Sequence, residues 1–132
     1  MNIQKYLNRI KYYSEVKTSK EVMFGLQKQH LLNIPFENLD IHYGTRIELD
    51  LKKIFQKIII EKRGGFCYEL NSLFNELLKE IGFNTFLISG RVNNENGTYG
   101  QEFDHMAIIV ILENKSYLVD VGFGRFILEP LE

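Results

Sequence analysis

One cysteine in this sequence is placed where a nucleophile for acyl transfer would be expected. Cys67 follows the pair Gly64-Gly65 and opens a segment with helical periodicity. A helix N-terminus favours the thiolate, the form of cysteine that attacks a carbonyl carbon. Spare N–H groups of the first helical turn can hold the resulting oxyanion. The sequence therefore predicts a nucleophilic Cys67; the alternative is a small hydrophobic residue in a tight loop that enters a helix.

A histidine and an aspartate occupy positions where polar side chains are unexpected. His105 begins an apolar run, and Asp120 lies between two valines in YLVDVGFG. A buried carboxylate needs a partner. With Cys67 these two residues would complete the nucleophile, base and orienting carboxylate of covalent acyl transfer. A histidine at the start of a strand is also often a surface residue, so Asp120 is the more informative of the two.

Helical periodicity dominates the sequence before Gly82. Apolar residues recur at helical spacing in four segments, which are residues 3–12, 18–31, 50–58 and 67–81. Thr18 with Glu21 predicts a capping box at the start of the second helix. Asp50 predicts the N-cap of the third helix, and Gly82 suits a left-handed end for the fourth.

The sequence after Gly82 is typical of strands, which we predict over residues 84–92, 105–112 and 116–123. If Asn114-Lys115 is the turn between the last two, His105 lies opposite Gly124. His105 and Asp120 are then offset by four residues, roughly 13 Å along the strand. Contact between them would need a bulge, strong coiling or a different register.

These elements predict an α+β fold in which residues 1–82 form a helical bundle with the cysteine and residues 83–132 form a sheet with the histidine and aspartate. The run MAIIVIL is continuously apolar, so its strand expects cover on both faces. Three strands leave open edges and an uncovered face. We therefore expect a further covering segment, a partner, or self-association into a homo-oligomer through the sheet.

Composition is that of a soluble globular protein of 132 residues, with 45% hydrophobic residues and a formal net charge of −1. This charge predicts no nucleic-acid partner, and the short apolar runs predict no membrane span. The N-terminus lacks an apolar signal segment, so we expect a cytoplasmic protein. Spacing predicts no metal site. Basic residues at positions 52–63 favour a solvated helix face over a site for a phosphorylated ligand.

Four segments resemble the arylamine N-acetyltransferases, and they occur in that family's order. RGGFCYELN is similar to the family's active-site signature, and IPFENLDIHYG is similar to the segment upstream of it. DHMAIIV and YLVDVGFG are similar to the segments that supply the family's histidine and aspartate. The resemblance covers residues 34–124, and YLNRI near the N-terminus is also family-like.

This resemblance implies acetyl transfer from acetyl-CoA to an arylamine or hydrazine by a ping-pong mechanism. Cys67 would carry the acetyl group, His105 would act as the base, and Asp120 would orient it. Two alternatives remain open at this stage. One is a papain- or transglutaminase-like enzyme that uses the same three residues, and the other is a non-catalytic module that binds or dimerises.

The resemblance also implies a substrate site and a larger fold. Phe36 and Phe123 would line the acceptor cleft, and Gly122 would lie beside the acetyl and pantetheine end of the donor; the two aromatics could equally serve in packing. The implied architecture is cysteine-protease-like, with the strands beginning a β-barrel. Family members are longer, so the resemblance implies that the C-terminal part of the family fold is absent and that turnover is impaired.

Overall fold

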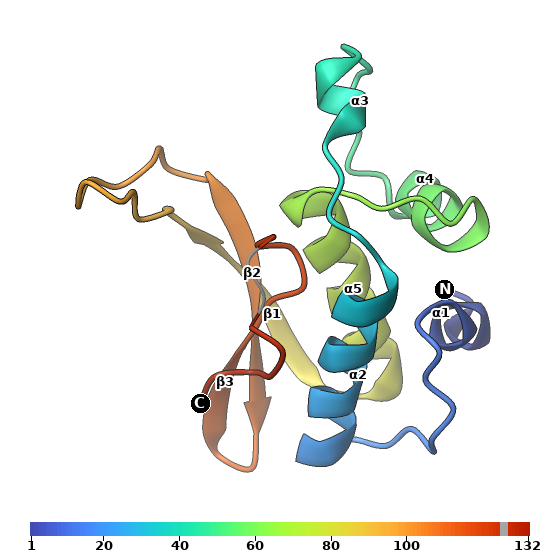
Figure 1. Cartoon of the computed structure of the whole chain (residues 1–132). Helices are drawn as coiled ribbons and strands as arrows, with labels where there is room; N and C mark the ends of the chain where they lie inside the picture. Colours follow the sequence, from blue (N-terminus) through green and yellow to red (C-terminus); the bar gives the residue numbers. More distant parts are fainter. Residues whose placement is uncertain (125–126) are drawn as a thin grey trace.

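The computed structural model describes residues 1–124 and 127–132. Within these ranges, helices precede a three-stranded antiparallel sheet of order β1-β2-β3. The sheet lies along one side of the helices, and α3 stands apart at one end (Figure 1). The elements are α1 (Ile3–Arg9), α2 (Lys20–Asn33), α3 (Leu39–His42), α4 (Leu51–Phe55), the π-helix η1 (Gln56–Ile60), α5 (Cys67–Ile81), β1 (Asn84–Gly90), β2 (His105–Leu112) and β3 (Lys115–Val119). The α+β fold is as predicted.

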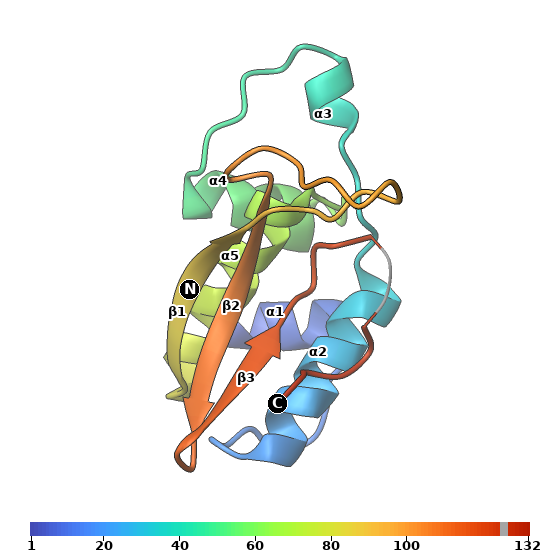
Figure 2. The same ribbon diagram turned by 90° about the vertical axis from the view of Figure 1, so that its left-hand side faces the viewer.

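Helix α5 is the centre of the core because it packs against both the other helices and the sheet. Its apolar stripe is buried, and it lies against β1 and β2 on one side and α1 and α4 on the other. Figure 2 shows the sheet in front of α5 and α2. Helices and strands share one hydrophobic cluster, whose strand members include Ile108, Val110, Tyr117 and Val119.

The helix ends follow local chemistry, and one predicted cap is wrong. Asp50 accepts hydrogen bonds from the two N–H groups of the first turn of α4, and Gly82 ends α5 at φ 109°, both as predicted. The N-cap of α2 is Ser19 and not Thr18. The Thr18 hydroxyl instead donates to the Ile81 carbonyl at 3.4 Å, which ties the start of α2 to the end of α5.

The turn between β2 and β3 differs from the prediction, and this difference matters for the site. Leu112 pairs with Lys115, so the two turn residues are Glu113 and Asn114, with φ of 51° and 63°. Positive φ at both positions is what a two-residue type I′ turn requires. The register is therefore shifted by two residues, and its extension sets His105 opposite position 122.

The sheet is less open than the sequence suggested at one edge. Beyond β3, Leu118 and Leu131 exchange two backbone hydrogen bonds of 2.7 and 3.0 Å. The prediction of an unpaired edge is therefore wrong at this point. In the part of the chain that the structure describes, β1 pairs only with β2, and Phe86 and Leu87 on it are exposed.

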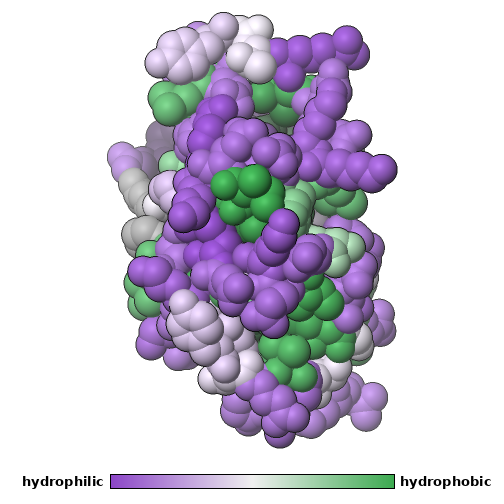
Figure 3. Space-filling model, turned by 90° about the vertical axis from the view of Figure 1, so that its right-hand side faces the viewer, coloured by the Kyte–Doolittle hydropathy of each residue, from purple (hydrophilic) through white to green (hydrophobic). Residues whose placement is uncertain are grey.

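The opposite side of the molecule, where α1 and α4 lie, is mostly hydrophilic and carries separate hydrophobic patches (Figure 3). None of the helices in the described ranges combines the length and the apolar character needed to cross a membrane.

Candidate functional site

Cys67 is the first residue of α5 and is largely buried. The glycine pair before it lets a second backbone segment pack alongside. The Glu37 N–H donates to the Gly65 carbonyl at 2.8 Å, and the Gly65 N–H donates to the Pro35 carbonyl at 3.4 Å. A Cβ on Gly64 would lie 2.1 Å from the Pro35 oxygen. Close approach of two backbones therefore requires glycine at position 64.

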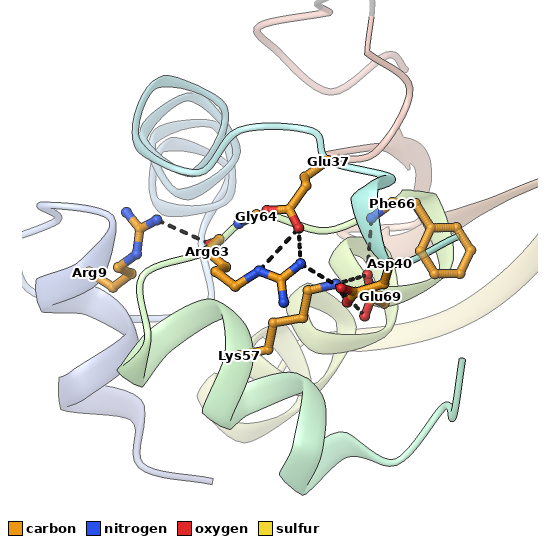
Figure 4. Close-up of polar contacts among 8 residues, drawn as sticks. All are labelled: Arg9, Glu37, Asp40, Lys57, Arg63, Gly64, Phe66 and Glu69. Atoms are coloured by element: carbon orange, nitrogen blue, oxygen red, sulfur yellow. Dashed lines mark hydrogen bonds and ion pairs between the residues drawn. The ribbon is translucent and has the colours of Figure 1, made fainter. Parts of the chain in front are cut away.

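Two carboxylates hold the backbone that leads into Cys67 (Figure 4). Glu37 accepts from the Gly64 N–H at 3.1 Å, and Glu69 accepts from the Phe66 N–H at 3.2 Å. The contact of Glu69 with the N-cap backbone is one half of a capping box. Its negative charge also lies at the positive end of the α5 dipole, where it stabilises the helix.

Each of these carboxylates is neutralised by a cation, and the two cations share a third carboxylate, Asp40. Lys57 Nζ lies 2.9 and 3.0 Å from the two Glu69 oxygens and 2.7 Å from Asp40. Arg63 binds Glu37 and lies 2.7 Å from the other Asp40 oxygen. We call Glu37, Asp40, Lys57, Arg63 and Glu69 the ion-pair network. The prediction of a solvated basic face is wrong for Lys57, whose side chain is only 12% exposed.

His105 and Asp120 are in contact, despite the offset expected from the sequence. His105 Nε2 lies 2.6 Å from Asp120 Oδ2. In the observed register the two residues are diagonal neighbours, a separation that long side chains span. The chain also leaves the ladder after Val119, and the Gly122 N–H donates to Asp120 Oδ1 at 2.8 Å. This aspartate-centred turn bends the backbone and aims the carboxylate at the imidazole.

Both Asp120 and Cys67 affect the pKa of the His105 imidazole. Burial lowers the pKa of His105, but the hydrogen bonds to Asp120 and to Cys67, together with the charges of both groups, outweigh it and raise the pKa to about 9. The imidazolium is therefore the form present at neutral pH, with Nε2 on the Asp120 carboxylate and Cys67 in the lining of the same cleft. The structure thus brings together the three residues that the sequence singled out for chemistry.

A cleft of about 490 Å³ opens beside these groups. Its lining includes Phe36, Phe123 and Gly122, together with Cys67 and His105. Residues 92–95 and 104 of the polar loop between β1 and β2 also line it; this loop projects from the end of the sheet (Figure 1).

The two aromatics of the cleft are surface residues. Phe36 is 47% exposed and Phe123 is 43% exposed, so neither belongs to the buried core of the described residues. The Phe123 ring meets the His105 ring edge to face, with centroids 5.1 Å apart. An apolar wall therefore stands directly beside the imidazole.

Gly122 packs against the nucleophile. A Cβ at this position would lie 2.7 Å from the Cys67 Cα and 2.9 Å from Asn71 Nδ2. Any side chain there must displace Cys67 or Asn71, which gives the glycine a steric reason to be present.

Sequence reasoning missed three residues that shape the site. Asn71 is fully buried in the apolar stripe of α5, one turn after Cys67. The Tyr68 hydroxyl donates to the Phe103 carbonyl at 2.5 Å, in the loop before His105. Glu69 joins the ion-pair network. Of these three, Asn71 could have been found from the sequence, since an amide amid leucines must find buried partners.

Comparison with protein families and known proteins points to one group. A family model described as N-acetyltransferase matches residues 21–132. The pineal gland isozyme NAT-3 of arylamine N-acetyltransferase from Gallus gallus is 42% identical over 126 residues, which are 94% of this chain and 43% of that protein. Arylamine N-acetyltransferase 2 of Mus musculus is 40% identical and aligns with the whole chain and 47% of its own length. The chain thus spans about half the length of the curated relatives it matches.

Solved structures agree with these relatives. The arylamine N-acetyltransferase of Mycobacterium abscessus superposes with a TM-score of 0.93 at 34% identity, over 99% of this chain and 46% of that one. The NAT3 enzyme of Bacillus cereus, described as having a unique Cys-His-Glu catalytic triad, superposes with a TM-score of 0.90 at 31% identity. The latter match covers 98% of this chain and 53% of the other.

Proposed function

This chain belongs to the arylamine N-acetyltransferase family, and from that premise we propose that it carries an acetyl group from acetyl-CoA to an arylamine or hydrazine on Cys67. The observation that supports this most is the meeting of three groups at one cleft: Cys67 at the start of α5, and His105 in hydrogen-bond contact with Asp120. A thiol next to a charged imidazole at a helix N-terminus is activated as a nucleophile.

In the first half-reaction, the Cys67 thiolate attacks the thioester carbonyl carbon of acetyl-CoA. A carbon–sulfur bond forms, and the N–H groups of the first turn of α5 stabilise the charge on the carbonyl oxygen. The bond from carbon to the CoA sulfur then breaks. The imidazolium of His105 donates its proton to the departing CoA thiolate, which leaves acetyl-cysteine and a neutral His105.

In the second half-reaction, the amine nitrogen attacks the carbonyl carbon of the acetyl-cysteine. Neutral His105 accepts the proton that the nitrogen loses, the bond from carbon to Cys67 breaks, and the thiolate and imidazolium are restored. Asp120 holds the ring so that one nitrogen faces the sulfur, and its charge stabilises the imidazolium.

Three cleft residues have proposed binding roles. Phe36 and Phe123 offer exposed aromatic surface on which an aromatic amine can stack. Gly122 would lie beside the acetyl and pantetheine end of the donor, since it lines the cleft and its backbone packs against Cys67.

The direct test is the intact mass of the protein after mixing with acetyl-CoA. We expect an increase of one acetyl group on the wild type, no increase on Cys67→Ala, and loss of the added mass when an arylamine is supplied. A folded wild-type chain that gains no mass would contradict the proposal. Peptide cleavage or reaction with glutamine would then favour a papain- or transglutaminase-like enzyme, and CoA binding without reaction would favour a binding module.

A further inference from the structure

We propose that Asn71 is the positioning residue of this site: it holds the Asp120 carboxylate, and through it the His105 ring, in line with Cys67. This inference rests on the function proposed above. Asn71 is fully buried and lies one helical turn after Cys67 on α5. Residues four apart share a face of a helix, so α5 presents Asn71 and the nucleophile toward the same end of the sheet.

The Asn71 side chain makes three hydrogen bonds, and all of them join α5 to the strand ends that bear the other two site residues. Its Nδ2 donates to Asp120 Oδ1 at 2.9 Å and to the carbonyl of Met106, the residue after His105, at 2.6 Å. Its Oδ1 accepts from the Val121 N–H at 2.9 Å. Both hydrogens of the amide nitrogen are therefore used.

These bonds determine how the Asp120 carboxylate is turned. Oδ1 accepts from Asn71 and from the Gly122 N–H, which leaves Oδ2 to face His105 Nε2 at 2.6 Å. Without Asn71, one of the two donors on Oδ1 is lost, and the Gly122 N–H alone holds that oxygen. The contact with Met106 fixes the backbone next to His105 from the other side.

If Asn71 only stabilised the fold, its loss would act on the site no more than the loss of another buried amide of α5. Asn75 is that amide, and it serves as the control. Asn75 is also buried on α5, one turn further along, and accepts from the Thr85 hydroxyl at 2.7 Å. It ties the same helix to β1, far from the thiol. Loss of the amide at position 75 therefore also removes a buried polar group from α5, without touching Asp120.

The experiment compares Asn71→Ala and Asn71→Leu with Asn75→Ala and Asn75→Leu, after thermal melts of all four. Leucine has the branched shape of asparagine and a larger volume, so it avoids the cavity that alanine leaves while it removes the amide. Two readouts need no acetyl-CoA: the His105 titration midpoint by NMR and the rate of Cys67 alkylation by iodoacetamide. The third is single-turnover acetylation by acetyl-CoA.

We expect both Asn71 variants to lower the His105 midpoint by about one pH unit and to slow alkylation and acetylation by about tenfold at neutral pH. The Asn75 variants should stay within about twofold of the wild type, at a comparable loss of stability. Equal effects of the two pairs on the His105 midpoint would overturn the inference. A wild type that is never acetylated would instead contradict the proposed function, since the first two readouts still measure Asn71.

Discussion

Replacing Lys57 with methionine tests whether the ion-pair network supports the approach to Cys67. The Lys57 side chain is 12% exposed, and that of Glu69, which it contacts at 2.9 Å, is 7% exposed. Methionine retains most of the apolar stem but removes the charge. Because Arg63 binds Glu37 and Asp40, the substitution leaves the Glu69 carboxylate buried without its cation.

The expected loss of stability is large for one substitution. Removing one partner of a buried ion pair destabilises by about 3–5 kcal/mol, because the remaining charge is uncompensated. Glu69 keeps its bond from the Phe66 N–H, so we expect about 3 kcal/mol. For 132 residues, an unfolding entropy of about 2 cal/mol/K per residue gives a fall in Tm of about 10 °C.

The matched control is Lys53→Met. Lys53 lies one turn earlier and binds Glu48, but its side chain is 65% exposed, so solvent screens this ion pair and its loss should change the stability little. The double variant Lys57→Met/Glu69→Gln removes both charges and should recover a large part of the loss. Differential scanning calorimetry measures all three. If Lys57→Met melts within about 2 °C of Lys53→Met, the network does not stabilise the fold in the way argued.

Three further substitutions test the site itself. Gly122→Ala places a methyl group 2.7 Å from the Cys67 Cα, so we expect a loss of about 1–3 kcal/mol in thermal melts and slower thiol alkylation. The folded pKa of His105, about 9, lies above its ordinary value of 6.5; its contribution to stability is therefore complete below about pH 6.5 and is lost as the pH rises through about 9. Urea unfolding across that window should show this slope in the wild type, and a similar slope in His105→Gln would refute it. Tyr68→Phe removes the hydroxyl that bonds the loop before β2, so hydrogen exchange in that loop should quicken while Tm falls by a few degrees at most.

Features that depend on neighbours in the chain were predictable from the sequence. The stripe of α5, the cap at Asp50 and the left-handed Gly82 each follow from residues within one or two helical turns. The position of Cys67 at the first turn of α5 follows from the same local signals. Its proximity to His105 and Asp120 came from the family resemblance, because no local pattern reports contacts between an early helix and a later sheet.

The register of the last hairpin could not be read from the sequence, for a physical reason. Register is specified when polar and apolar residues alternate, because a shifted pairing then exposes apolar side chains. The strand from Met106 to Leu112 is apolar throughout, so it carries no such signal. The register then depended on which two residues form the turn. Asn114 fits a turn with either neighbour; the prediction was Asn114-Lys115, and the observed pair is Glu113-Asn114.

The ion-pair network was hidden for a similar reason, since each contact joins segments far apart in sequence. Lys57 meets Asp40 from η1, and Arg63 meets Glu37 from the segment before α5. A charge count at positions 52–63 sees mostly cations and one carboxylate, Glu61, and so favours a solvated face. Burial reverses that interpretation, because a cation that loses water must gain carboxylates.

One helix carries the nucleophile of the candidate site and two of the residues that hold its surroundings in place. The first turn of α5 carries Cys67 and Glu69, which holds the incoming backbone, and the second turn carries Asn71, which holds Asp120. The nucleophile and the amide that holds Asp120 are thus fixed to one rigid element. The aromatic wall of Phe36 and Phe123 is nearly half exposed by comparison. The groups around the thiol are therefore more buried than the aromatic wall, and the two meet where the Phe123 ring packs on the His105 ring.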